Sequence, residues 1–237
     1  MVDLYDLAFA RNISGGGAPA PVLIQKNITE NGMYNAASDS ADGYSSVTVA
    51  VSDKYISGAE LIYTADPTLP IMSFNQNYEV TLPFTYEVCC KVSSSHTTNG
   101  RWSQLSKYTA ASPVISACIA CNGANDKNIE IALNAQWYSS INIPQVADAL
   151  TTISIVVRET EFDLYINGVF QSTIDVTNPG QWSSYIGSMQ RLYMRSGSTD
   201  QRTIPNGKLY SMRLYNKALS QSELTKNRAA DIALFSA

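Results

Sequence analysis

The sequence predicts an all-β protein, a two-sheet sandwich that ends in one short helix. Short runs of β-prone residues recur from about residue 55 onward, and turn residues separate them. One capped helix start follows the last of these runs. The hydrophobic fraction of 45% is enough for a core, and the charged fraction is only 15%. The length of 237 residues suits one domain of ordinary size with a small addition.

The chain starts with a predicted docking peptide at residues 1–21. Residues 3–12 read as a short helix, in which Asp3 is the cap and Arg11 lies near the end, as the helix dipole favours. A Gly-rich and then Pro-rich linker follows at residues 14–21. So short a helix is marginal unless it packs on something. We therefore expect docking to a partner, and the alternative is a disordered leader.

Residues 22–52 are predicted to form a small β module. Asn31-Gly32 and Asp42-Gly43 mark two tight turns with strands on either side. The string ITENG-x-Y-x-A followed by ADGYSSVTV-x-V resembles a module of tail, baseplate and appendage proteins of phages and prophages of Gram-positive hosts. The leader LYDLAFARNISGGG resembles the start of the same proteins. This resemblance implies a virion location, with residues 1–21 docked to other virion proteins.

Residues 55–237 are predicted to form the sandwich. Its clearest strands are 78–92, 113–121, 128–135, 151–158, 162–167, 186–195 and 207–215. Turn signals between them include Asn122-Gly123 and Asn178-Pro179-Gly180. Many short strands with a single terminal helix fit a jelly-roll sandwich.

The end of the chain gives the most specific pattern. Asn167-Gly168 supplies the two positive-φ residues of a tight hairpin turn. Ser220 and Glu223 have the spacing of a capping box, which predicts a helix from about Gln221. The order LYINGV, GKLYSMRLYNKALS and the S-x-x-E helix start resembles the closing half of laminin-G-like, concanavalin A-like jelly rolls. That architecture is shared by lectins, adhesins, structural modules and glycosidases.

Charge and hydropathy argue against two classes of partner. The net charge is −4 and no Lys/Arg cluster occurs, so a nucleic-acid partner is not expected. No apolar run approaches the ~18 residues needed to span a bilayer, so no membrane insertion is expected. The start of the chain also lacks the basic and apolar regions of a signal peptide. We expect assembly in the bacterial host cytoplasm.

The four cysteines are interpreted as buried free thiols. Cys118-x-x-Cys121 has zinc-like spacing. However, Cys89 and Cys90 lie in an alternating strand, so they should point to opposite sheet faces and could not easily join the other pair around one ion.

Enzymatic activity is not expected. Glu159, Glu161 and Asp163 superficially resemble the acidic strand of concanavalin A-like glycoside hydrolases, which need two carboxylates on one strand face. By the resemblance, however, this acidic run lies at a hairpin tip, where carboxylates are solvated. A serine or cysteine nucleophile would need a histidine base, and His96 is the only histidine.

No cofactor is expected, although bound calcium stays open. Related sandwiches often bind it through loop carboxylates and carbonyls. The candidate side chains are Asn122, Asn125, Asp126 and Asp200, and none lies in a dense acidic loop. Ordinary polar turns explain them better.

The candidate glycan-binding residues are aromatic rings next to amides or arginine. They are Trp182 and Tyr185, with Trp137 and Tyr138 in a second group and Trp102 in a third. A pyranose face stacks on a ring while its hydroxyls form hydrogen bonds. The alternative is that each ring fills the core, which is the commoner use of Trp and Tyr.

The sequence thus predicts a phage virion protein that presents a lectin-like domain to host-surface carbohydrate. We expect a homo-oligomer, a trimer, because phage appendages are usually symmetric and multiple copies strengthen weak binding. The main alternative is a non-adhesive decoration, head-fibre or tail structural protein. A polysaccharide-degrading enzyme is the third alternative.

Overall fold

The computed structural model describes the greater part of the chain from residue 70 onward and little before it. The described residues are 23–24, 56–57, 70–73, 78–97, 99–108, 113–122, 127–138, 141, 143–189, 191–195 and 207–235. The predicted docking peptide, residues 1–21, and nearly all of the predicted β module, residues 22–52, lie outside them.

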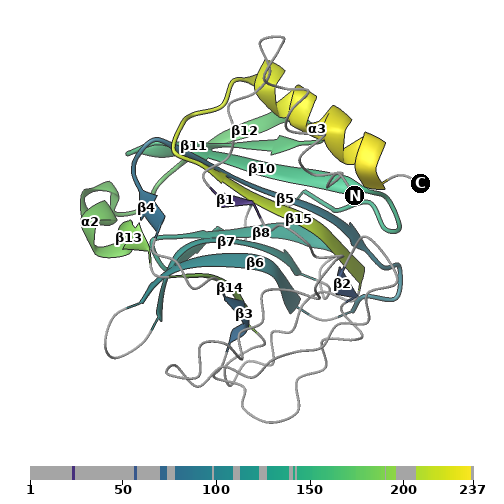
Figure 1. The fold of residues 1–237 in the computed structure, drawn as a ribbon, viewed down its shortest axis with the longest axis horizontal. Coiled ribbons are helices and arrows are strands. Elements are labelled where there is room, and N and C mark those ends of the chain that lie inside the picture. The colour runs from purple at the N-terminus through teal and green to yellow at the C-terminus, as the bar shows by residue number, and fades with distance from the viewer. Residues whose placement is uncertain are drawn as a thin grey trace, which may run out of the picture.

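Two antiparallel sheets pack face to face (Figure 1). Sheet A has the strand order β1-β15-β5-β10-β11-β12, and β2 also pairs with β15. Its strands are β1 (Leu23–Ile24), β2 (Ile56–Ser57), β5 (Phe84–Val92), β10 (Thr151–Val157), β11 (Glu161–Ile166), β12 (Val169–Asp175) and β15 (Gly207–Tyr215). This architecture confirms the predicted all-β sandwich.

Sheet B has the order β3-β14-β6-β7-β8-β9. Its strands are β3 (Pro70–Ser73), β6 (Asn99–Tyr108), β7 (Pro113–Asn122), β8 (Asn128–Leu133), β9 (Gln136–Tyr138) and β14 (Arg191–Arg195). The short strands β4 (Tyr78–Val80) and β13 (Gly187–Met189) pair with each other beside the sheets.

The core lies between the two sheets and follows the strand period of two. In β5, Phe84, Tyr86 and Val88 point inward and lie in one cluster with Ile119 and Ile131 of sheet B. Because the buried residues of both sheets alternate with residues on their outer faces, each sheet has a second face to cover or expose.

A helix covers the outer face of sheet A (Figure 1). This helix, α3 (Gln221–Phe235), begins at the residue that the capping box predicted. Glu223 accepts a 2.7 Å hydrogen bond from the Ser220 backbone N–H, and the Glu223 backbone N–H donates to the Ser220 hydroxyl at 3.4 Å. The capping-box prediction is confirmed.

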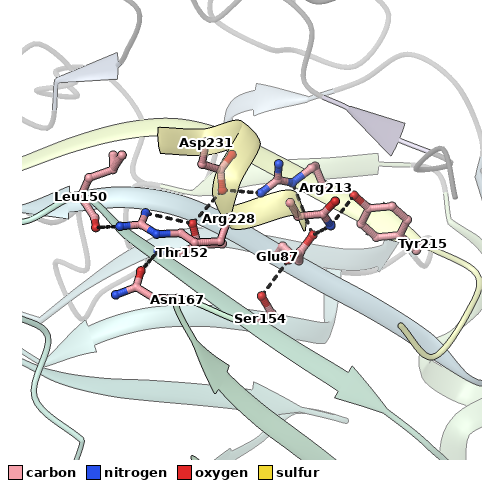
Figure 2. A network of polar contacts seen from close by, with 10 residues as sticks. Glu87, Leu150, Thr152, Ser154, Asn167, Arg213, Tyr215, Arg228 and Asp231 are labelled. Atoms are coloured by element: carbon pink, nitrogen blue, oxygen red, sulfur yellow. Dashed lines mark hydrogen bonds and ion pairs between the residues drawn. The ribbon is translucent and has the colours of Figure 1, made fainter. Parts of the chain in front are cut away.

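Buried polar contacts hold α3 to the sheet (Figure 2). Asp231 accepts hydrogen bonds from Arg213 of β15 at 2.6 Å and from the Thr152 hydroxyl of β10 at 2.7 Å. One turn earlier on the helix, the Asn227 side chain donates to Glu87 of β5 at 2.6 Å. Three sheet strands are thereby tied to one face of the helix.

The Glu87 carboxyl and the Arg213 guanidinium affect each other beneath α3. Burial raises the pKa of Glu87 above its ordinary value, although the Arg213 charge opposes this. Burial disfavours charged Arg213, but the carboxylates of Asp231 and Glu87 outweigh it and raise the pKa of Arg213. Arg213 therefore stays charged between two acidic groups.

The hairpin predictions hold. Asn167 and Gly168 have φ of 54° and 76° between β11 and β12, as a tight turn requires. A Cβ at Gly168 would also lie 3.0 Å from the Thr225 backbone of α3. Of the acidic run, Glu159 falls at the opposite tip between β10 and β11, as predicted. The prediction was wrong for Glu161 and Asp163, which lie in strand β11 and pair with β12, and Asp163 is buried.

Some element predictions need correction. Residues 99–108, which are not among the clearest predicted strands, form the long strand β6, and Trp102 lies within it. The predicted strand 78–92 divides into β4 and β5 around Pro83, which lacks the N–H that a strand ladder needs. The predicted strand 186–195 divides into β13, which pairs with β4, and β14, which belongs to sheet B.

Two N-terminal segments join sheet A. Leu23–Ile24 pairs with Leu214 and Arg213, and Ile56–Ser57 pairs with Leu209 and Lys208 of the same strand, β15. Leu23–Ile24 falls within the range predicted for the small module. The boundary at residues 52–55 between module and sandwich stays a prediction.

All four cysteines are buried and free. Cys89 packs with Tyr210 and Phe235 under α3, whereas Cys90 lies in the core between the sheets, as the alternation predicted. Burial raises the pKa of both thiols and raises that of Cys121 to about 12. Such thiols are poor nucleophiles and metal ligands at neutral pH.

In the part of the chain that the structure describes, no helix is both long and apolar enough to cross a membrane.

Candidate functional site

Trp182 is a core residue, which corrects its interpretation as an exposed ring platform. It begins the short helix α2 (Trp182–Tyr185), in a segment that the sequence indicated only as a loop. Its side chain is 5% exposed and meets Phe84 edge to face, with ring centroids 6.1 Å apart. The indole N–H donates to the Glu159 carbonyl at 2.7 Å. The helical turn directs the ring inward, where its apolar area is buried.

Trp102 and Tyr138 are also packed in the core. Trp102 lies on the inner side of β6, is 0% exposed and donates its indole N–H to Gln145 at 3.1 Å. The Tyr138 hydroxyl accepts a 2.8 Å hydrogen bond from the Thr177 N–H, and its ring meets Phe162 at 5.2 Å. Neither ring offers a free face to a sugar.

Trp137 lies on the outer face of sheet B and is only half-buried. It packs with the small side chains of Cys118, Ala120 and Ala132, which are also on that face. The guanidinium of Arg101, from β6, lies over the indole at 5.1 Å from the ring centroid, which is within cation–π range. The structure thus brings together the group around Trp137 and the group around Trp102. The contact between them is made by Arg101 and not by Trp102.

The backbone of Tyr185 is joined to strand β7 through Ser116. The Ser116 hydroxyl of β7 donates a short hydrogen bond to the Tyr185 carbonyl. The Ser116 carbonyl accepts a hydrogen bond from the Asn134 N–H at 3.3 Å. Asn134 belongs to the turn between β8 and β9, three residues before Trp137. Ser116 therefore connects α2, which carries half-buried Tyr185, to the hairpin that carries Trp137.

We define the hairpin site as Arg101, Asn134, Trp137 and Tyr185, with Ser116 between them. The sequence pointed to Trp137 and Tyr185 as ring candidates next to amides or arginine, but it did not single out Arg101 or Asn134. It could not show that the two groups lie side by side, because Ser116 gives no sequence signal.

Asn134 is the least expected member of the hairpin site. Its φ of 49° fits the turn, which Asn tolerates well. Its side chain is 1% exposed, yet neither Nδ2 nor Oδ1 has a hydrogen-bond partner. Leaving a buried polar group unpaired costs about 1–3 kcal/mol, so such groups are rare in native proteins.

Glu130 adds a carboxylate to the outer face of sheet B. It lies between the inward-pointing Ile129 and Ile131 of β8, so its side chain is on the Trp137 side. Glu130 accepts a 2.9 Å hydrogen bond from Asn122 at the end of β7. Arg101 and Glu130 are described side chains of this face, and their charges are of opposite sign.

At the acidic run, the two strand carboxylates, Glu161 and Asp163, are both engaged by Arg158. Glu159 is exposed, and Glu161 lies 3.5 Å from Arg158. Asp163 accepts hydrogen bonds from Arg158 at 2.8 Å and from the Thr173 hydroxyl at 2.6 Å. These contacts tie Asp163 and Glu161 to a neighbouring arginine, and none of them belongs to the hairpin site.

The calcium candidates lie mostly outside the described residues. Asn125, Asp126 and Asp200 are outside, and Asn122 donates its amide to Glu130. Within the described ranges, no group of three or more His, Cys, Asp or Glu side chains could hold a metal ion. Bound calcium stays untested.

With the sandwich and its outer faces described, the family can be stated. Residues 66–225 match the family described as the concanavalin A-like lectin/glucanases superfamily, which is more than half of the chain. The chain belongs to this superfamily. A search of curated proteins finds no significant match.

Solved structures share the fold across this superfamily. A heptameric SAP-like pentraxin from Limulus polyphemus has a TM-score of 0.51 at 16% identity, covering 68% of this chain and 76% of the pentraxin. A Trypanosoma rangeli sialidase, solved with sialic acid, has a TM-score of 0.50 at 10% identity. That match covers 70% of this chain but only 28% of the sialidase chain. At such identities the likeness shows the fold alone, and 347 matching chains mean that the fold does not select one activity.

Proposed function

We propose that this lectin/glucanase-superfamily protein binds carbohydrate at the hairpin site and does not hydrolyse it. The observation that carries the proposal is the Ser116 link, in which Ser116 bonds to the Tyr185 carbonyl and to the Asn134 N–H and so brings α2 next to the hairpin that carries Trp137. The site then offers two partly exposed rings beside a guanidinium. Sugar sites commonly combine apolar ring surface with a few placed polar groups.

Arg101 changes the expected mode of contact. Its guanidinium lies over the Trp137 ring, while small side chains pack against that ring from the sheet. A pyranose would therefore meet the exposed part of Trp137 and the Tyr185 ring. The buried Arg101 guanidinium holds the indole in place through this stacking contact.

The biological setting that we propose is a phage virion. It rests on the resemblance of residues 22–51 and of the leader to appendage proteins of phages of Gram-positive hosts. In this proposal residues 1–21 dock to other virion proteins, and a homotrimer presents its hairpin sites to host-surface glycans. Several copies in one particle turn weak single-site binding into useful avidity, with gains of about 10²–10⁴.

The test compares two site variants with one control on a glycan array and in whole-cell adsorption. Trp137→Ala and Tyr185→Ala should each reduce binding about tenfold or more, because each removes ring contact. Phe170→Ser is the control, since Phe170 is 45% exposed on β12 of sheet A, away from the site. Equal loss in the control and the site variants would contradict the proposed location.

A non-adhesive structural role is the second candidate. The burial of Trp182, Trp102 and Tyr138 favours it, because those rings serve packing and leave fewer platforms for sugar. The same array separates the two roles: an intact oligomer that binds neither cells nor glycans supports the structural role. Release of reducing sugar, lost in Glu159→Gln or Glu161→Gln, would instead indicate an enzyme.

A further inference from the structure

The Asn134 carboxamide is the feature of the hairpin site that chain packing does not explain. A residue with φ of 49° at this turn must tolerate the left-handed region, which both Gly and Asn do. The backbone conformation therefore accounts for an Asn or a Gly. It does not account for a buried amide whose donor and acceptor are both unused.

The polar groups nearest to Asn134 along the chain and across the sheet are already engaged. The Ser116 hydroxyl donates to the Tyr185 carbonyl, and the Ser116 carbonyl accepts from the Asn134 N–H. Next to them, the Ala135 N–H donates to the Ile115 carbonyl at 2.9 Å. These groups are engaged with one another while the Asn134 carboxamide has no partner, so its partners must come from water or from a ligand.

A second asparagine in the same kind of turn shows the ordinary arrangement. Asn167 has φ of 54° between β11 and β12, and its side-chain oxygen accepts a 3.0 Å hydrogen bond from the Thr152 N–H. There the side chain serves the fold. Asn134 has the same backbone role without the side-chain bond.

We propose that Asn134 is the specificity-determining residue of the hairpin site and that the site takes an uncharged saccharide. This inference rests on the proposed carbohydrate function. A carboxamide presents one donor group and one acceptor, which together match a pair of adjacent sugar hydroxyls. Ala135 and Gln136, the next two residues of the turn, are exposed, so the turn that carries the amide lies at the surface.

The charges of the face select against an acidic sugar. Arg101 would attract a carboxylate, but Glu130 on the same side of the sheet repels it. A carboxylate placed at the amide has no proton to donate, so it would pair with the Asn134 N–H groups only and leave the Asn134 oxygen unpaired. A neutral sugar hydroxyl donates and accepts, and it meets both halves of the amide.

The experiment uses the full chain and an array that carries neutral oligosaccharides beside their sialylated and uronic acid-containing counterparts. Wild type is compared with Asn134→Gly, which keeps the turn, and with the matched control Asn167→Gly. We expect wild type to prefer neutral saccharides at least tenfold. Asn134→Gly should lose at least tenfold in affinity while its Tm is unchanged or raised, because an unpaired amide is removed.

Asn167→Gly should behave in the opposite way, with a lower Tm and unchanged saccharide affinity, because it loses a satisfied hydrogen bond far from the site. If Asn134→Gly binds like wild type, or if its Tm falls with affinity unchanged, a buried water satisfies the amide and the inference is wrong. A preference for acidic saccharides overturns the ligand class. If wild type binds no saccharide, the proposed function itself fails and this inference fails with it.

Discussion

At the scale of single residues, each tryptophan has a specific neighbour that decides its role. Trp102 donates to Gln145, whose amide in turn donates to the Cys90 sulfur at 3.0 Å. Trp182 donates to the Glu159 carbonyl and packs against Phe84. Trp137 alone lies on an outer face, beneath Arg101. Two indoles therefore stabilise the sandwich, and one is available for binding.

The first prediction separates these two roles by substitution. Trp182→Ala should lower the free energy of unfolding by about 3–5 kcal/mol, because a large buried ring leaves a cavity and an unpaired carbonyl. Urea denaturation would measure the loss. Glycan binding per folded molecule should stay at the wild-type level. Loss of binding in a fully folded variant would mean that Trp182 contacts the sugar after all.

Some features of single residues could be predicted from the sequence and others could not. The Asn167-Gly168 turn and the Ser220–Glu223 capping box were predictable because their signals lie within four residues of sequence. The inward direction of Trp182 was not, since it depends on Phe84 and Glu159, which are distant in sequence. The unpaired amide of Asn134 leaves no sequence signal.

At the scale of elements, α3 is attached to sheet A by charge as well as by apolar contact. Leu224 and Leu219 pack with Tyr215 and Val156, while Asp231 and Asn227 reach the buried groups of three strands. Removing one member of a buried charged group leaves its partners unpaired, which is strongly destabilising. The helix is thus part of the sandwich and not an appendage to it.

The pH dependence of stability tests this attachment. Glu87 has a pKa raised by burial in the folded state, so its contribution to stability is complete below the unfolded pKa of about 4.5 and is lost as pH rises through the higher folded value. The difference in unfolding free energy between wild type and Glu87→Gln should therefore grow in favour of wild type as pH falls toward 4.5. Each unit of pKa shift corresponds to about 1.4 kcal/mol.

Denaturant melts at a series of pH values would measure that difference. Glu223 serves as a contrasting position: its hydrogen bonds outweigh burial and lower its pKa, so its contribution is lost as pH falls. The two Glu→Gln variants should give difference curves of opposite slope. Parallel curves would contradict the assigned environment of Glu87.

A strand could be predicted where its own residues show which of its faces is buried, and could not where only its neighbours in the sheet determine it. The alternation in β5 is clear because one side is apolar throughout, and β10 is buried on both faces since α3 covers the sheet, although its α3-facing residues include Thr152 and Ser154. Strand β6, NGRWSQLSKY, contains few β-branched or aromatic residues, and its place between β7 and β14 holds it in the sheet. Tertiary pairing overrides such weak local preference.

At the scale of the whole molecule, the family match and all the described strands lie after residue 21. The match covers residues 66–225, and the first described strand, β1, pairs with β15 from Leu23 onward. A truncation that removes residues 1–21 therefore keeps every strand that the structure describes. This gives a clean test of the proposed docking peptide.

We expect the truncated chain to be folded and soluble but absent from assembled particles. The body should keep its unfolding transition, because the removed residues contribute no described strand or core residue. Particle incorporation should fail, since the short apolar helix predicted at residues 3–12 would have been the contact to the virion. Purified particles from a complemented deletion strain, analysed for copy number of this chain, would measure it.

A double variant, Leu4→Ser with Leu7→Ser, keeps the leader and changes only its apolar side, and it should prevent incorporation as fully as deletion does. Asp6→Asn is the matched control and should leave incorporation unchanged. Sedimentation of the isolated chains then shows whether the leader also drives self-association, for which a trimer is expected.

If truncated chains enter particles at normal copy number, the docking surface lies in the body and not in residues 1–21. In that case the exposed Val169 and Phe170 on edge strand β12 would be the first surface to test, because exposed apolar groups commonly mark contacts between proteins.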